Sequence, residues 1–197
     1  MRPVIAVVVK NLKNAVDRST MHNYETLIKL FDNCFKETYN TRLMSGSDEP
    51  IYLPASENCA FHRIVFANGF FSSALHECAH WFIAGEKRRQ LIDFGYWYNP
   101  DGRTPAQQSL FEKVEIKPQA LEWILSVAAN YSFRMSLDNL NGISTNSTPF
   151  KLAIYEQVKN YLNNGLPQRA EIFKNVICET YKTPKLMTLN QFDLSII

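Results

Sequence analysis

Apolar residues recur at helical spacing along most of the chain, and this pattern predicts a helix-rich fold. In the first such stretch, Tyr24, Leu27, Phe31 and Phe35 fall on one helical face. The stretch over 70–84 is apolar on nearly every side, which predicts a buried helix. The helices expected from the whole pattern cover residues 22–37, 70–84, 105–129, 150–164 and 168–181.

Local signals mark where several of these helices begin and end. Gly85 follows the 70–84 stretch, as expected of a glycine just beyond a helix C-terminus. Thr104 and Gln107 have the spacing of a capping box, and Pro105 occupies the first helical position. Because proline lacks a backbone N–H, Pro118 predicts a kink or a restart inside the 105–129 helix.

Between residues 41 and 68, short apolar segments alternate with turn-forming residues, which predicts a small antiparallel sheet. Few short strands beside several helices favour an α+β fold. The length of 197 residues fits a single domain, at roughly 100 to 200 residues per domain. We expect an N-terminal extension over 1–20, the folded domain over 21–185 and a C-terminal tail over 186–197.

Composition and charge exclude several classes of protein. Apolar residues make up 46% and charged residues 20%, a globular balance that excludes a disordered chain. The net charge is 21 − 19 = +2 without a long basic block, so direct binding to nucleic acid is not expected. The apolar runs are far shorter than the ~20 residues of a membrane helix, and no signal peptide is recognisable. With cysteines that form no CxxC pair, these features predict a cytoplasmic protein with reduced thiols.

The strongest chemical signal is the sequence His76-Glu77-Cys78-Ala79-His80, an HExxH motif within a helical apolar frame. Histidines four positions apart on a helix lie about 40° apart around its axis and about 6 Å along it. Both ring nitrogens can therefore reach one metal ion. Glu77 projects beside that position, where it can bond a metal-bound water without being a ligand. Without a metal, the apolar neighbours would bury two imidazoles that lack partners.

A two-histidine site needs at least one more ligand, and a carboxylate from another helix is the usual completion of a hydrolytic zinc site or a non-haem iron site. Glu112, Glu115, Gln119 and Glu122 form a polar stripe on the 105–129 helix. We expect Glu115 to be the third ligand, with Glu112 as the alternative, because Glu115 lies nearer the middle of the apolar stretch.

Several long blocks of the chain resemble the bacterial elongation factor P hydroxylase family, over roughly four fifths of its length. The blocks that carry the resemblance are Tyr39-Asn40-Thr41-Arg42-Leu43, Asp48-Glu49-Pro50-Ile51-Tyr52-Leu53-Pro54, His62-Arg63-Ile64-Val65-Phe66-Ala67, the HExxH motif with Trp81 and Ile83-Ala84-Gly85, Asp93-Phe94-Gly95-Tyr96-Trp97-Tyr98, Pro100-Asp101-Gly102-Arg103, and Val114-Glu115 with Lys117-Pro118-Gln119-Ala120-Leu121. Residues 1–20 have no counterpart in this resemblance.

The resemblance implies that residues 21–185 are a metal-dependent hydroxylase domain with a zincin-like metal helix. The implied reaction is an oxygen-using monooxygenation of the lysine-derived side chain of elongation factor P. Fe(II) is the implied metal, and zinc can occupy such a site in purified protein. A long modified lysine needs an apolar wall along its stem and polar groups at its tip. We therefore expect Tyr96 and Tyr98 to line the substrate pocket, and Asp93 and Asp101 to meet its ammonium groups.

Two other classes of function remain open from the residues alone. In a zinc metallopeptidase, Glu77 would be the general base that deprotonates the attacking water. In a hydroxylase, Glu77 would instead orient a bound water, dioxygen or the substrate ammonium. A metal-stabilised binding protein is disfavoured, because structural zinc sites are usually closed by four protein ligands. The ligand types do not distinguish iron from zinc.

Overall fold

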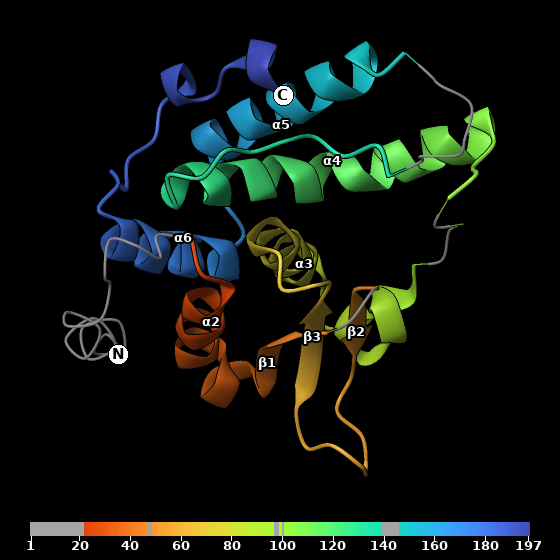
Figure 1. Cartoon of the computed structure of the whole chain (residues 1–197), viewed down its shortest axis with the longest axis vertical. Helices are drawn as coiled ribbons and strands as arrows, with labels where there is room; N and C mark the ends of the chain where they lie inside the picture. The colour runs from red at the N-terminus through yellow and green to blue at the C-terminus, as the bar shows by residue number, and fades with distance from the viewer. Residues whose placement is uncertain (1–21, 47–48, 97–98, 100, 139–145) are drawn as a thin grey trace.

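The computed structural model describes residues 22–46, 49–96, 99, 101–138 and 146–197 (Figure 1). The predicted N-terminal extension therefore lies outside the described residues. The helices and strands are α2 (Tyr24–Tyr39), β1 (Thr41–Ser45), β2 (Ile51–Leu53), β3 (His62–Phe66), α3 (Phe71–Ile83), η2 (Arg88–Gln90), η3 (Ile92–Gly95), α4 (Pro105–Ala128), α5 (Thr148–Asn164), α6 (Gln168–Tyr181), η4 (Leu189–Gln191) and η5 (Leu194–Ile196). Every helix predicted from the apolar pattern is present, and the helix-rich α+β class is confirmed.

Helix α4 begins where the sequence predicted and continues past its internal proline. The Thr104 hydroxyl accepts a hydrogen bond from the Gln107 N–H, and the Gln107 side chain accepts one from the Thr104 N–H, so the capping box is formed. The predicted restart at Pro118 does not occur. Pro118 is buried, as are nearly all residues from there to the helix end, so packing offsets the one backbone hydrogen bond that proline removes.

The sheet is mixed, so the prediction of an antiparallel sheet was wrong. The strand order is β1-β3-β2, with β3 antiparallel to β2 but parallel to β1. The chain reverses direction from β1 to β2 and again from β2 to β3, so the first and third strands run the same way. The order then places those two strands side by side, which turn signals alone do not reveal.

Helix α4 crosses the middle of the molecule, with α5 on one side and α3 on the other (Figure 1). Helix α3 also contacts β3 and β1, so it lies between α4 and the sheet. Its packed face includes Leu75, Cys78 and Phe82, all within one continuous core. The segment predicted as a C-terminal tail adds Met187 and Phe192 to that core. Among the described residues, no helix is long and apolar enough to cross a membrane.

Two arginines bind the carbonyl groups at the C-terminal end of α3. Nη2 of Arg169 donates to the carbonyl oxygens of Trp81 at 2.9 Å, Phe82 at 3.1 Å and Ala84 at 2.6 Å. Nη1 of Arg89 donates to the Ala84 carbonyl oxygen at 2.8 Å. The last carbonyls of a helix lack partners within it, and positive charge is favourable there. These contacts fix the end of the helix that carries the HExxH motif.

Candidate metal centre

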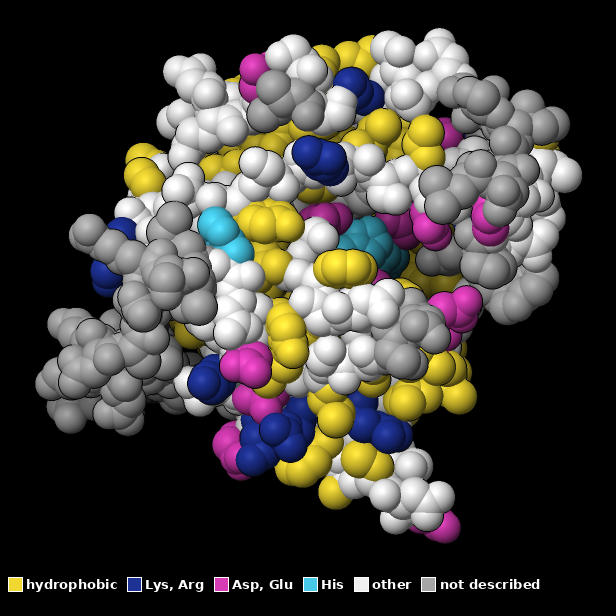
Figure 2. All heavy atoms as spheres, viewed as in Figure 1, with side chains coloured by type: hydrophobic (Ala, Val, Ile, Leu, Met, Phe, Trp, Pro, Cys, Tyr) yellow, Lys and Arg dark blue, Asp and Glu magenta, His cyan; other side chains and the backbone are white. Residues whose placement is uncertain are grey.

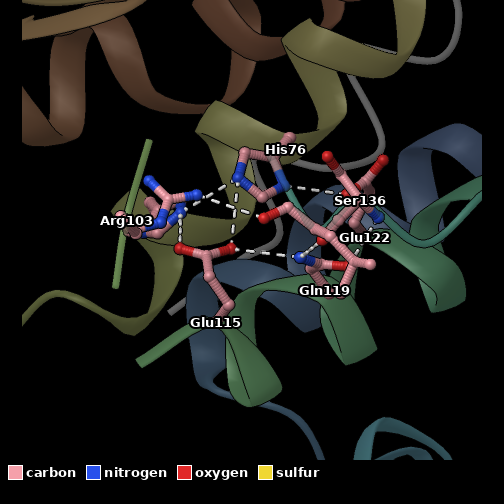
Figure 3. A network of polar contacts seen from close by, with 8 residues as sticks. His76, Arg103, Glu115, Gln119, Glu122 and Ser136 are labelled. Carbon is pink, nitrogen blue, oxygen red and sulfur yellow. Dashed lines mark hydrogen bonds and ion pairs between the residues drawn. The ribbon is translucent and has the colours of Figure 1, made fainter. Parts of the chain in front are cut away.

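His76 projects from α3 toward Glu115 of α4 (Figure 3). These two side chains form one group with His80, which is also on α3. The two Nε2 atoms lie 3.1 Å apart. Oε2 of Glu115 lies 3.5 Å from Nε2 of His76, and Oε1 lies 3.2 Å from Nε2 of His80. Taking one ligand atom from each residue, the three atoms lie within 4.8 Å of one another. The structure therefore brings together the residues that the sequence predicted as ligands.

These separations fit a single ion at the centre of the group. An ion about 2.1 Å from each ligand atom separates two ligands by about 3.0 Å at a right angle and about 3.4 Å at a tetrahedral angle. The Oε1 atom of Glu115 is buried and has no hydrogen-bond partner in the described part of the chain. A cation at this position would satisfy that oxygen and both imidazole nitrogens.

Glu122 holds the other ring nitrogen of His76. Its Oε2 lies 2.8 Å from Nδ1 of His76, and the residue is 7% exposed (Figure 3). A carboxylate in this position fixes the tautomer and the orientation of a ligating imidazole. Burial would lower the pKa of His76, but the hydrogen bond that Glu122 accepts from it and the charges of Glu115 and Glu122 raise it to about 10. The surroundings thus favour a positive charge at this imidazole.

Gln119 supports Glu115 from the next turn of α4. Its Nε2 lies 3.5 Å from Oε2 of Glu115 and donates to the Ser136 carbonyl oxygen at 2.8 Å, while Oε1 accepts from the Ser136 N–H at 3.1 Å (Figure 3). Burial would raise the pKa of Glu115, but His80 and His76 lower it to about 2. Glu115 is therefore an anion held in place, as a metal ligand must be.

Glu112, the alternative third ligand, lies apart from this group. It accepts a hydrogen bond from Nε2 of Gln108 at 3.2 Å, and it is not among the residues that cluster with the histidines. The position of Glu115 four residues before Gln119 and seven before Glu122 puts those three on one helical face. That spacing was visible in the sequence, but the burial of the face depends on α3 and on the segment around Ser136.

Glu77 lies beside the group without belonging to it. Burial raises the pKa of Glu77, with the charges of Glu115 and Asp93 acting in the same direction against those of His76 and His80. A carboxyl group with a raised pKa can hold or release a proton next to the candidate metal position. This is chemically compatible with either role that the sequence suggested for it.

The candidate ligands line a cavity of about 1250 Å³, and the other charged residues of its lining are mainly acidic. Figure 2 shows a histidine side chain at the bottom of a hollow, with acidic side chains beside it. The ionisable residues that line this acidic cavity are His22, Glu49, His76, Glu77, His80, Asp93, Tyr96, Glu115, Glu122, Tyr131, Arg134 and Asp138. Such a cavity attracts a long, positively charged group.

The residues predicted to bind substrate do not all lie at this cavity. Asp93 and Tyr96 line it, and Oδ1 of Asp93 also accepts a hydrogen bond from the Tyr52 N–H at 2.8 Å. Asp101 is exposed and is not part of the cavity lining. Its Oδ1 accepts a hydrogen bond from the Gly102 N–H at 2.7 Å. Tyr98 lies outside the described residues. The sequence placed Glu122 and Gln119 in the polar stripe of the 105–129 helix but did not predict that they would contact His76 and Glu115.

Two comparisons place the chain among known proteins. The sequence profile of the elongation factor P hydroxylase family matches residues 30–192, which include both α3 and α4. The chain is also similar to a protein of Haemophilus influenzae named elongation factor P lysine hydroxylase. The two are 54% identical over 176 residues, which cover 89% of this chain and 99% of the relative.

Proposed function

Since the chain belongs to the elongation factor P hydroxylase family, we propose that it uses dioxygen and a metal ion to hydroxylate the modified lysine of elongation factor P. Family membership makes it an enzyme, a protein-lysine hydroxylase. The observation that carries the proposed site is the group of His76, His80 and Glu115 at the acidic cavity. The proposed partner is elongation factor P, and the proposed location is the cytoplasm, where translation factors work.

We assign Fe(II) to the site as a non-haem centre held by His76, His80 and Glu115. Two imidazoles and one carboxylate with open positions are the ligand set of non-haem iron oxygenases. When bound, iron supplies the activation of dioxygen. Glu122 keeps the His76 ring oriented, and Gln119 does the same for the Glu115 carboxylate. The HExxH sequence on α3 makes this a zincin-like metal helix.

The acidic cavity would hold the substrate lysine in an extended form. Its volume of about 1250 Å³ is ample for one long side chain. Asp93 and Glu49 at its wall would attract the ammonium groups, and Tyr96 would cover the apolar stem. Glu77, beside the histidines, would hold a proton or hydrogen-bond the substrate ammonium. The aromatic wall would also exclude water from the reacting carbon.

The reaction can be tested with the purified full-length chain and elongation factor P that carries the modified lysine. Protein loaded with Fe(II) without oxygen, then exposed to heavy-isotope dioxygen and a reductant, should add one heavy oxygen atom to that lysine. The zinc-loaded protein should add none. Mass spectrometry of the modified peptide measures both results. In cells, deletion of the gene should remove one oxygen atom from the same residue.

Addition of oxygen from water instead of dioxygen would contradict this proposal. Hydrolysis of unfolded peptides by the zinc-loaded protein that disappears in Glu77→Gln would replace it with a metallopeptidase function. Glu112→Gln is a matched control, because Glu112 is a carboxylate of the same helix as Glu115 but outside the metal group. It should leave oxygen transfer unchanged, whereas Glu115→Gln should abolish it.

A further inference from the structure

A second cavity, of about 750 Å³, lies next to the acidic cavity and shares two of its wall residues, His80 and Tyr96. Its charged lining residues are mainly basic, opposite in sign to those of the acidic cavity. They are Lys87 and Arg88 in the segment after α3, Lys113 and Lys117 on α4, and one acidic residue, Glu86. We call it the basic cavity. It reaches the candidate metal group at His80, which is part of its lining.

Within the described part of the chain, the cations of the basic cavity have no carboxylate partners. Neither Lys87, Lys113 nor Lys117 forms an ion pair or a side-chain hydrogen bond with any described residue. Lys113 and Lys117 are four positions apart on one helix, a spacing at which like charges repel. The chain thus gathers four cations and one carboxylate, Glu86, at this cavity, and an anionic ligand would reduce the repulsion among the cations.

Arg88 is held in place at the wall of this cavity. Its Nη1 donates to the Phe94 carbonyl oxygen at 2.8 Å, and its guanidinium lies 4.0 Å from the centre of the Tyr96 ring. A cation–π contact of this kind fixes the guanidinium without neutralising its charge. The remaining N–H groups are suited to an oxyanion. The sequence suggested only a solvated helix end for this basic run.

Hydroxylation requires a third reactant besides dioxygen and the lysine. Insertion of one oxygen atom into a C–H bond leaves the other atom to be reduced to water, which takes two electrons and two protons. Small reductants of cells, such as ascorbate and the dihydronicotinamide dinucleotides, are anions. The acidic walls of the larger cavity repel an anion and attract the cationic lysine, so the two reactants need different entrances.

We propose that the basic cavity binds a small anionic two-electron reductant next to His80, with Lys113, Lys117, Lys87 and Arg88 as its anion-binding groups. This inference rests on the proposed hydroxylase function. With AH₂ as the reduced anion, the balance is R–H + O₂ + AH₂ → R–OH + A + H₂O. The O–O bond and one C–H bond of the lysine side chain break, and a C–O bond and an O–H bond form there. AH₂ gives up two electrons and two protons to the second oxygen atom, which becomes water.

Anion binding can be tested without activity. Sulfate, a poor ligand for zinc, is titrated into the zinc-loaded full-length protein at constant ionic strength, with amide resonances followed by NMR. Resonances of residues 83–88 and 113–117 should shift and saturate. In the double variant Lys113→Gln/Lys117→Gln, the affinity should fall at least tenfold. Lys29→Gln/Lys151→Gln is the charge-matched control, because neither lysine lines the basic or the acidic cavity, and it should leave the titration unchanged.

Kinetics then identify the ligand. In the Fe(II)-loaded enzyme, Lys113→Gln/Lys117→Gln should raise the KM for the anionic reductant at least tenfold while the KM for elongation factor P stays constant. Ascorbate and a dihydronicotinamide dinucleotide are tested in separate measurements. The comparison shows whether the electron donor is an enediolate or a phosphate-bearing dinucleotide. A rise in the KM for elongation factor P alone would overturn the proposal and make the cavity a docking surface for an acidic segment of the protein substrate.

The two experiments separate failure of this inference from failure of the proposed function. If sulfate shifts no resonances around the basic cavity, or shifts them equally in the double variant, the basic cavity is not an anion site. If sulfate binds as expected but no donor supports oxygen transfer to elongation factor P by the wild-type chain, the hydroxylase function and the reductant assignment fail together. An unchanged KM for every donor in the double variant overturns the reductant assignment alone.

Discussion

The acidic and basic cavities meet at His80 and Tyr96 but are built in different ways. In the acidic cavity, the carboxylates of Glu115 and Glu122 are buried, with 1% and 7% of each residue exposed. Each accepts a hydrogen bond from a neighbouring side chain. The cations of the basic cavity are exposed, and of these four side chains only Arg88 has a fixed contact with described residues. Buried, bonded groups suit a site that must keep ligand atoms in one geometry. Exposed cations suit a ligand that enters and leaves.

The difference also predicts how each cavity responds to salt and to substitution. Exposed charges are screened within about 8 Å at physiological ionic strength, so anion binding at the basic cavity should weaken as salt rises. Charges on buried groups are screened much less. Substitutions in the acidic cavity should therefore act through metal retention and geometry, and those in the basic cavity through the affinity for a soluble anion.

The largest effect is expected at His80, one of the two residues that the cavities share. His80→Ala removes one proposed ligand from the group and should abolish both metal retention and oxygen transfer. Metal content after gel filtration and mass spectrometry of elongation factor P measure these losses. His62→Ala is the matched control, because His62 accepts a hydrogen bond from the Ala55 N–H and lines neither cavity. Retention of stoichiometric metal by His80→Ala would remove His80 from the ligand set.

The next largest effect is expected behind the ligands, at Glu122. Glu122→Gln keeps an oxygen that can accept from Nδ1 of His76 but removes the charge, and Glu122→Ala removes both. Loss of a carboxylate that orients a ligating histidine typically costs about 10- to 100-fold in metal affinity. We expect a loss in this range for Glu122→Ala and a smaller loss for Glu122→Gln, measured by competition with a chelator. Equal affinity in all three proteins would show that Glu122 does not position His76.

How far the sequence predicted this site depends on the kind of contact. The helical spacing of His76 and His80 is local, so the pattern alone placed both on one face of α3. Glu115 followed from its place in an apolar stretch. The roles of Glu122 and Gln119 could not be predicted, because their partners His76 and Ser136 lie on other segments.

The same limit applies to the fold and to the basic cavity. The spacing of apolar residues predicted the helices. The parallel pairing of β1 with β3 depends on the order of the strands in the sheet, which a local sequence pattern does not indicate. Lys87 and Lys117 are distant in sequence, and only the packing of α3 on α4 brings the segments that carry them to one cavity. Charge clusters made of separate segments are therefore visible only in the folded chain.

A smaller effect, but one that separates two chemistries, is expected for Glu77→Gln. A peptidase that lost its general base would lose about 10²- to 10⁴-fold in rate with metal still bound. In the hydroxylase, no water has to be deprotonated to attack a carbonyl, so a measurable rate of oxygen transfer should remain. The ratio of the rates of Glu77→Gln and wild type, at equal iron content, measures this. A loss beyond about 10⁴-fold would give Glu77 an essential proton-transfer role.

The smallest effect is expected at the wall of the acidic cavity, where two aspartates form a matched pair. In both Asp93 and Asp101, Oδ1 accepts a hydrogen bond from a backbone N–H, of Tyr52 and Gly102 respectively, which asparagine can still accept. Only Asp93 lines the cavity. Because a partly exposed charge pair contributes about 0.2 to 1 kcal/mol, Asp93→Asn should raise the KM for elongation factor P by roughly 1.5- to 5-fold without changing kcat. Asp101→Asn should leave both constants unchanged, and an equal rise in KM for the two variants would place the substrate ammonium outside the acidic cavity.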